Sequence, residues 1–274
     1  MQSLLKIEWL KLKNYMVFKV LSIFFVVGVV LTNYIVYSVN KNIVGSIKPI
    51  NLVAAFNPYT FENTWQTTSY ATGYLLILPA LLIIILVTNE FSFRTSRQNI
   101  IDGWSRQEFI HVKMMLALLI SIASTLLVIL TAAGFAMFSK SEFSLNGFDH
   151  VGYFLLKSFS YNMMAILVSV LIRRTGFAIG LYFIYLGAEN IISQLLDVWS
   201  MKLKKDGVAD LGSMGDYLPM NASDGLLTFP DNPLKSIAKA ALPTDYYSVV
   251  IACAAVYLVF FIWFSRRRFI HSDL

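Results

Sequence analysis

Residues 74–87 read YLLILPALLIIILV, and residues 88–109 read TNEFSFRTSRQNIIDGWSRQEF. The first stretch carries no charge, and extension back to residue 67 gives it about the 20 residues that a helix needs to cross a bilayer. The second stretch is polar, yet it contains several large apolar side chains. We therefore predict a membrane-spanning helix at residues 67–87, followed by a loop whose apolar side chains pack against something.

Five further segments have the apolar character and length of a membrane span. They are residues 16–37, 112–138, 151–172, 176–196 and 246–264. The whole chain is 57% hydrophobic and only 14% charged, whereas a soluble domain is typically about 45–50% apolar and about 25% charged. The composition and the spread of the apolar segments predict an all-α fold, in which residues 1–274 form one transmembrane domain of six helices.

Lysine and arginine in the short loops predict the orientation, because cytoplasmic loops carry an excess of both. The basic residues that would then face the cytoplasm are Lys6, Lys11, Lys13, Lys19, Arg94, Arg97, Arg106, Lys113, Arg173, Arg174 and Arg266–Arg268. The first two short loops on the other side hold only Lys41, Lys48 and Lys140. Both termini are therefore predicted to be cytoplasmic, and the apolar stretch at 16–37 is too long for the apolar core of a cleaved signal peptide.

Several function classes find no support in the sequence. The net charge of +6 comes from clusters at the ends of apolar runs, where lipid and topology explain it better than nucleic acid does. No phosphate-binding Gly-x4-Gly-Lys-Ser/Thr loop and no Gly-x-Ser-x-Gly elbow occurs, and the histidines lack metal-ligand spacing. The single cysteine, Cys253, excludes an intrachain disulfide. We predict no catalytic residue, no metal site and no cofactor held by this chain.

The first sixteen residues mix polar and apolar side chains. Leu5, Trp9, Leu12 and Met16 recur at helical spacing on one face. A helix with such a face lies in the membrane interface, with its tryptophan at headgroup level. The alternative is that the first spanning helix simply extends into the cytosol.

The loop at residues 90–111 holds, up to residue 109, six large apolar side chains interleaved with charged ones. They are Phe91, Phe93, Ile100, Ile101, Trp104 and Phe109. An apolar patch in a water-side loop normally packs on headgroups, on its own bundle or on another subunit. The alternative is a solvated loop that only satisfies the positive-inside rule, although that rule requires neither tryptophan nor phenylalanine.

In this loop the sequence resembles the permease subunits of type-2 ABC exporters. Their pattern has a glutamate at the end of the second span, then a threonine, a basic residue, two aliphatic residues, a proline and a Ser-Arg pair, and a lysine that opens the third span. The matching residues here are, in order, Glu90, Thr95, Arg97, Ile100, Ile101, Ser105, Arg106 and Lys113. Gly103 stands where the family usually has proline. The motif covers about twenty-five residues, while the topology agrees over the whole chain, most of all with short permeases of bacteriocin immunity, copper-enzyme maturation and gliding systems.

The resemblance implies a role for the loop. In that family it forms a coupling helix that docks in a groove of a separate ATPase subunit, which binds ATP and Mg²⁺. The residues expected to carry this docking are Glu90, Phe93, Arg94, Thr95, Arg97, Ile101, Gly103, Trp104, Ser105 and Arg106. The resemblance further implies a bacterial cytoplasmic (inner) membrane and pairing with a second permease copy or a homologue.

Ionisable side chains inside a span are costly and are therefore functional candidates. Glu189, with Asn190 beside it, lies in the fifth predicted span and is the leading candidate for substrate passage or gating. A structural hydrogen bond is the alternative role for Glu189, and a re-entrant pair of half-helices is an alternative for this span. Lys157 and Asn162 are weaker candidates, because Lys157 can extend toward the membrane surface.

Residues 197–245 form a long predicted loop on the outer side. This loop holds five lysines and seven aspartates. A short helix is predicted at residues 233–241, because Asn232 suits the N-cap position and Pro233 the first helical position. The loop either contacts an extracytoplasmic partner or serves as an ordered connector.

Three functions compete at this stage. The first is the permease subunit of an ATP-driven exporter, dimeric and powered by a separate ATPase. The second is an ion-coupled secondary transporter with Glu189 as its ion site, and the third is a membrane scaffold of a secretion or motility complex. The substrate is not readable from the sequence.

Overall fold

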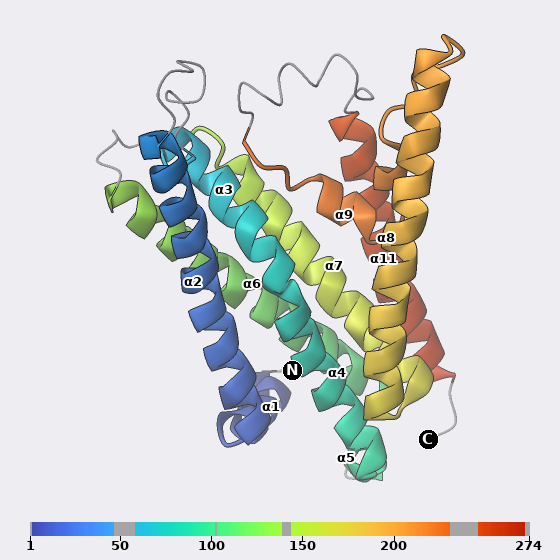
Figure 1. Ribbon diagram of the computed structural model, residues 1–274. Helices are drawn as coiled ribbons and strands as arrows, with labels where there is room; N and C mark the ends of the chain where they lie inside the picture. Colours follow the sequence, from blue (N-terminus) through green and yellow to red (C-terminus); the bar gives the residue numbers. More distant parts are fainter. Residues whose placement is uncertain (1, 47–57, 102, 139–143, 231–245, 272–274) are drawn as a thin grey trace.

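A computed structural model describes residues 2–46, 58–101, 103–138, 144–230 and 246–271. Every regular element in these ranges is a helix. Six helical segments are long and apolar enough to cross a membrane, which confirms the predicted number (Figure 1). Their bounds are Met16–Val39, Asn63–Ser92, Arg106–Phe138, Asp149–Ile172, Thr175–Lys205 and Tyr247–Ile270.

These segments belong to helices that mostly extend past the predicted limits. The single-helix crossings are α2 (Met16–Ser46), α6 (Arg106–Phe138), α7 (Asp149–Ile172), α8 (Thr175–Lys205) and α11 (Tyr247–Ile270). The second crossing is composite, and its parts are α3 (Phe61–Gly73), the 3₁₀ turn η1 (Tyr74–Leu76) and α4 (Ile77–Ser92). Pro79 explains the break, because it has no N–H to donate to the carbonyl four residues earlier, in η1.

Helix α7 forms the centre of the bundle. In its spanning window 72% of the residues are buried, against 17% in each of α2 and α8. Phe154, Met163 and Ile166 of α7 are fully buried and pack in one core with α4, α6 and α11. The outer faces of α2, α8 and α11 remain apolar and exposed, as expected of surfaces that meet lipid.

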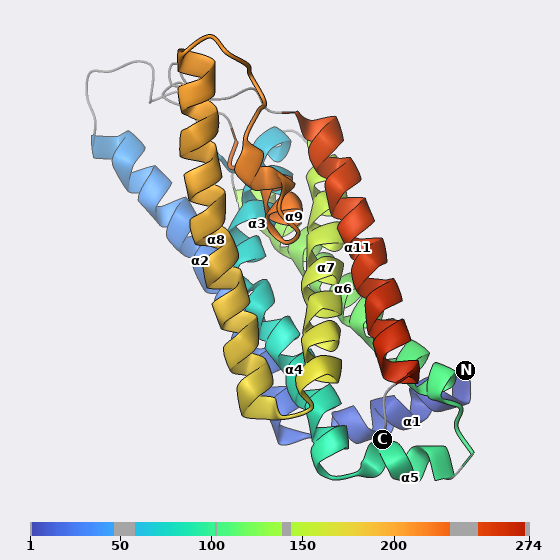
Figure 2. The same cartoon turned by 90° about the vertical axis from the view of Figure 1, so that its right-hand side faces the viewer.

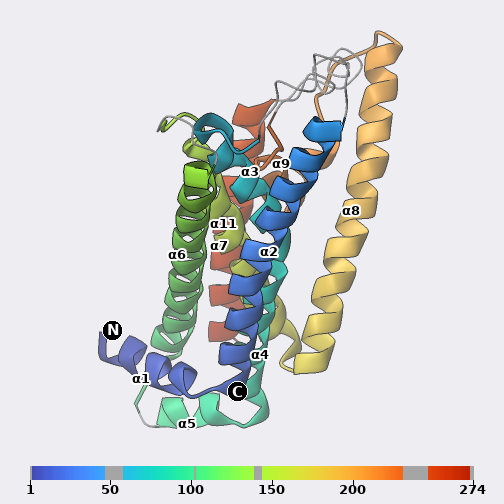
Figure 3. The ribbon, with the colours of Figure 1, turned by 60° about the vertical axis from the view of Figure 1, so that its left-hand side comes forward.

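Two short helices cross the same end of the bundle, here called the α5 end. They are α1 (Gln2–Lys13) and α5 (Thr95–Ile101), and both run roughly across the bundle axis (Figures 2 and 3). The chain breaks between α1 and α2 at Asn14 and Tyr15, so α1 is not an extension of the first crossing. Of the predicted apolar face, Leu12 is buried on the bundle, whereas Trp9 and Met16 are exposed.

The other end of the bundle, here called the α9 end, differs most from the predictions. Helix α8 is continuous from Thr175 to Lys205, so the alternative of two half-helices is wrong. Residues 206–230 then fold back against the bundle, and the short helix α9 (Asn221–Gly225) buries Ala222 and Ser223 completely. The helix predicted at residues 233–241 lies outside the described residues.

Candidate functional site

The loop at residues 90–111 forms a surface at the α5 end. Helix α5 occupies its middle, and two apolar side chains project from the bundle here: Phe93, before α5, is 75% exposed, and Ile101, the last residue of α5, is 84% exposed. Arg94 and Arg97 are also exposed. We call these four residues, Phe93, Arg94, Arg97 and Ile101, the α5 surface. It combines exposed apolar side chains with exposed basic side chains.

Other predicted docking residues instead build the loop. Trp104 is partly buried against the core, and the ammonium group of Lys11 lies 5.9 Å from its ring centroid. The Thr95 hydroxyl donates to the carbonyl oxygen of Glu90 over 3.3 Å. Gly103 has φ +105°, a conformation that a proline at this position cannot adopt.

Ser105 and Arg106 connect this loop to α6 and α11. The Ser105 hydroxyl accepts from the backbone N–H of Glu108 over 3.1 Å, and the Glu108 carboxylate accepts from the Ser105 N–H over 2.9 Å. This reciprocal pair is a capping box, which satisfies free amides at the start of α6. Arg106 donates to the carbonyl oxygen of Ile270 over 2.9 Å, at the C-terminus of α11.

A buried charge cluster joins α1, α4 and α6. The ammonium group of Lys113, whose side chain is 2% exposed, lies 2.5 Å from Glu8 and 2.7 Å from Glu90. Lys11 lies 3.0 Å from Glu8 and 3.4 Å from Glu90, at the rim of the cluster. We call Glu8, Lys11, Glu90 and Lys113 the base cluster. Two lysines neutralise two carboxylates, which is the condition under which charges are tolerated in a low-dielectric interior.

The base cluster shifts the protonation of its α1 members. Burial raises the pKa of Glu8, but the charges and hydrogen bonds of Lys113 and Lys11 outweigh burial, so that the pKa lies below its ordinary value. Burial lowers the pKa of Lys11, but the carboxylates of Glu90 and Glu8 outweigh burial and place the pKa above its ordinary value. Both shifts favour the charged forms that hold α1 against α4 and α6.

A second set of polar contacts at the same end reaches α8. Asn89, next to Glu90, donates to the Tyr15 hydroxyl over 2.7 Å. The neighbouring Thr88 hydroxyl is 2.8 Å from the hydroxyl of Thr175, at the start of α8. The end of α4, from which α5 begins, is therefore bonded directly to the start of α2, α6 and α8.

Glu189, the leading intramembrane candidate, is 6% exposed and faces residues 206–230, here called the α9 segment. Its Oε1 accepts from the backbone N–H groups of Met220 over 2.6 Å and Asn221 over 2.9 Å. Its Oε2 is buried without a hydrogen bond of good geometry among the described residues, although the Tyr185 hydroxyl lies beside the same carboxylate. Glu189 therefore does anchor the α9 segment, which is the structural alternative stated for it. Asn190 is exposed and accepts from Gln194 over 2.6 Å.

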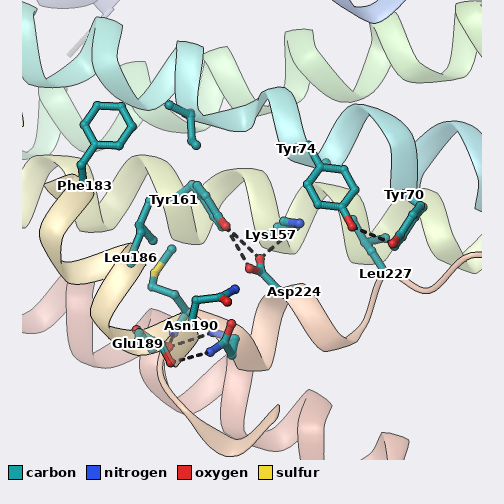
Figure 4. A pocket seen from close by; sticks show the side chains of 15 residues that line it. Tyr70, Tyr74, Lys157, Tyr161, Phe183, Leu186, Glu189, Asn190, Asp224 and Leu227 are labelled. Atoms are coloured by element: carbon teal, nitrogen blue, oxygen red, sulfur yellow. Dashed lines mark hydrogen bonds and ion pairs between the residues drawn. The ribbon is translucent and has the colours of Figure 1, made fainter. Parts of the chain in front are cut away.

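Glu189 and Asn190 both line a cavity of about 550 Å³ enclosed by α3, η1, α7, α8 and α9 (Figure 4). Inside it the ammonium group of Lys157 lies 3.1 Å from the carboxylate of Asp224. The Tyr161 hydroxyl donates to the same carboxylate over 3.0 Å. Lys157 lies about 12 Å from the start of α7, at 1.5 Å per residue, and thus within the membrane-spanning part.

The Lys157–Asp224 pair is a feature that sequence reasoning missed. Lys157 was expected to extend toward the surface, yet its side chain is only 7% exposed. Gly73 makes room for it, since a Cβ at that position would lie 3.0 Å from the Lys157 nitrogen. The available signal was a lysine inside a predicted span together with seven aspartates in residues 197–245, but nothing in one sequence identifies which aspartate pairs with the lysine.

Comparisons with protein-family models and with curated proteins do not assign the chain to a family. No protein-family model and no curated protein matches the chain.

Proposed function

We propose that this protein is the membrane subunit of an ATP-driven exporter, coupled through the α5 surface to a separate ATPase in the cytosol. One observation carries the proposal: the α5 surface projects from the bundle, while the base cluster ties its root to α1, α4 and α6. Exposed aromatic and aliphatic side chains beside arginines are typical anchors of protein interfaces. The α5 end would face the cytosol, as the positions of lysine and arginine predict.

The geometry supports a mechanical role for the loop. A force applied to α5 reaches α4 through the chain, α6 through Lys113 and α11 through the bond from Arg106 to Ile270. The side chains of the base cluster cannot easily move apart, because each buried charge would lose its partner, at a cost of several kcal/mol. Closure of two ATPase subunits would thus move whole helices, and a second copy of this chain would complete the transporter.

Co-purification with matched variants tests the docking role. The protein is purified from its native membranes in mild detergent, and ATP hydrolysis is measured on the eluate. Ile101→Asp introduces a charge into the α5 surface and is expected to lower the co-purified ATPase activity at least about tenfold. Gln107→Asp places the same side chain at another exposed position of the loop and is expected to leave the activity unchanged. A wild-type eluate without ATPase activity would contradict the proposal.

The ion-coupled transporter and the membrane scaffold have less support. An ion-coupled transporter was expected to use Glu189, but one oxygen of this carboxylate already accepts two backbone N–H groups. A scaffold was expected to dock through residues 197–245, but much of the described part of that segment is packed on the bundle. Transport that follows an ion gradient without ATP would favour the former, and a stable complex without ATP hydrolysis the latter.

A further inference from the structure

The cavity at the α9 end has exposed side chains on η1 and α8. Tyr74 and Phe183 line it there and are 62% and 44% exposed. Both residues belong to helical segments long and apolar enough to cross a membrane, so this side of the cavity is expected to face lipid. A molecule that enters here arrives from the membrane, with its polar group leading into the cavity and its chain remaining in the lipid.

The charges in the cavity select for a cation. Asp224 and Glu189 contribute two carboxylates, against the single ammonium group of Lys157, so the formal charge of the lining is −1 (Figure 4). Lys157 is nearly enclosed, whereas the Asp224 side chain is 33% exposed. The accessible charge in the cavity is therefore carboxylate, while the ammonium group already lies against Asp224.

Aromatic rings add to this selectivity. The Lys157 nitrogen lies 5.8 Å from the Tyr74 ring centroid and 5.6 Å from the Tyr161 ring centroid, so the lining already accommodates one ammonium group among aromatic rings. Tyr70 and Tyr74 are paired through their hydroxyl groups over 2.6 Å, which holds the rings at the rim. Tyrosine faces attract ammonium groups, the more so where water is excluded.

We propose that this cavity binds the ammonium head group of an amphiphile that enters from the lipid between η1 and α8. The Asp224 carboxylate contacts the head group, the buried carboxylate of Glu189 adds negative charge behind it, and the rings of Tyr70 and Tyr74 cover it. The alkyl chain leaves past Phe183 along the apolar face of α8. The site requires no ATPase, so its occupancy and the proposed transport function succeed or fail separately.

Photolabelling of the purified protein tests the head-group chemistry. Three probes share one photoreactive dodecyl chain and carry an ammonium, a hydroxyl or a phosphate head group, and dodecyl maltoside micelles provide a neutral background without ammonium. Peptides from α7 and α8 are expected to be labelled by the ammonium probe at least about fivefold more than by the hydroxyl probe, as one charge-assisted contact predicts. Equal labelling by both probes, or stronger labelling by the phosphate probe, would overturn the assignment.

Two variants distinguish the effect of charge on labelling from the effect of cavity space. Glu189→Gln removes one charge but can still accept from both amides, and it is expected to lower ammonium labelling about fivefold without changing hydroxyl labelling. Gly187 lines the cavity and has open space at its Cβ position, so Gly187→Trp fills the cavity and should abolish labelling by every probe. Gly180→Trp is the matched control on the same helix, because Gly180 also has open space but does not line the cavity. Unchanged labelling in Gly187→Trp would refute the site.

Competition distinguishes the source of the ammonium group. Unlabelled phosphatidylethanolamine, added in micelles, is expected to displace the ammonium probe, whereas soluble ethylammonium chloride is not, since it lacks the chain that the lipid-facing opening admits. Displacement by ethylammonium at concentrations as low as those of the lipid would show a site for free amines and overturn the amphiphile assignment.

Discussion

The ammonium nitrogen of Lys113 lies 2.5 Å from a carboxylate oxygen of Glu8, a residue 105 positions earlier in the chain. The contact attaches the N-terminal helix α1 to the root of α6. Glu90 completes it from the end of α4, so that one lysine holds three helices beside α5. This contact is internal to the chain, and it explains why a lysine opens the third crossing without any reference to a partner subunit.

Lys113→Met should destabilise the protein strongly. Removal of the lysine leaves Glu8, whose side chain is 4% exposed, without its closest cation in the interior. Loss of one partner from a buried pair typically costs about 3–5 kcal/mol. Thermal unfolding in detergent should show a clear decrease in the melting temperature. The double variant Lys113→Met/Glu8→Leu should recover part of the loss, and an unchanged melting temperature in the single variant would rule out a structural role for the cluster.

The attachment of α1 should depend on pH only at the extremes. The pKa of Glu8 is lowered from 4.5 in the folded protein, so its contribution is complete above that value and is lost as the pH falls through the lowered pKa. The pKa of Lys11 is raised from 10.5, so its contribution is complete below that value and is lost as the pH rises through the raised pKa. Amide exchange of residues 2–13 should be constant between about pH 6 and about pH 9 after correction for intrinsic rates.

The acid-side loss has a direct control. Glu8→Gln removes the titrating group, so the extra exchange of α1 below pH 4.5 should disappear while exchange at neutral pH is already raised. A wild-type protein whose α1 loosens near pH 6.5 instead would indicate a histidine, not the base cluster, as the group that controls attachment.

Gly103 should tolerate no other residue without strain. Its φ of +105° is unfavourable for side chains with a Cβ, at a cost of about 1–3 kcal/mol, although a Cβ would meet no neighbour. Gly103→Ala should therefore loosen the segment between α5 and α6 through backbone strain alone, and Gly103→Pro more so. Limited proteolysis between α5 and α6 measures this, with Gly134→Ala in helix α6 as a control that likewise has open space. Equal cleavage in the two alanine variants would contradict the expectation.

Asp224 should stabilise the α9 segment through Lys157. Asp224→Asn leaves the buried ammonium group without a counter-ion, and we expect a loss of about 2 kcal/mol, less than for a fully enclosed pair because Asp224 is partly exposed. Lys157→Gln/Asp224→Asn removes both charges and should be more stable than Asp224→Asn alone. A double-mutant cycle of melting temperatures gives the coupling, and purely additive effects would show that the pair makes no net contribution.

Much of the fold could be predicted because it depends on local composition. An apolar run of sufficient length identifies a crossing wherever it occurs, and all six were found in this way. Helix limits were less accurate, since an apolar run shows where lipid ends and not where the helix ends. Helix α8 continues nine residues beyond residue 196 because Asp197 accepts from the Gly215 N–H over 2.9 Å and the Ser200 hydroxyl bonds to the Gly212 carbonyl.

The same distinction between local composition and distant contacts applies to the candidate sites. The sequence displays the apolar residues of the loop but not which of them are exposed: Phe93 and Ile101 project, whereas Phe109 is buried. Glu90 shares Lys113 with Glu8 in the base cluster. A sequence could not predict this contact, because no local pattern distinguishes Glu8 from other acidic residues near an N-terminus. Likewise the pairing of Lys157 with Asp224 joins two elements that are distant in sequence, and only the path of the chain through space brings them together.

The separation of Lys157 from Asp224 has a consequence for biosynthesis. A ribosome adds roughly 5–20 residues per second, so the lysine enters the membrane several seconds before its aspartate exists. During this interval the ammonium group must reach toward the surface, as a lysine alone in a span does. We expect it to turn inward only when residues 206–230 have been synthesised and have folded back against the bundle. Residues 206–230, which precede α11 in the chain, thus supply the counter-ion of a lysine that is already in the membrane.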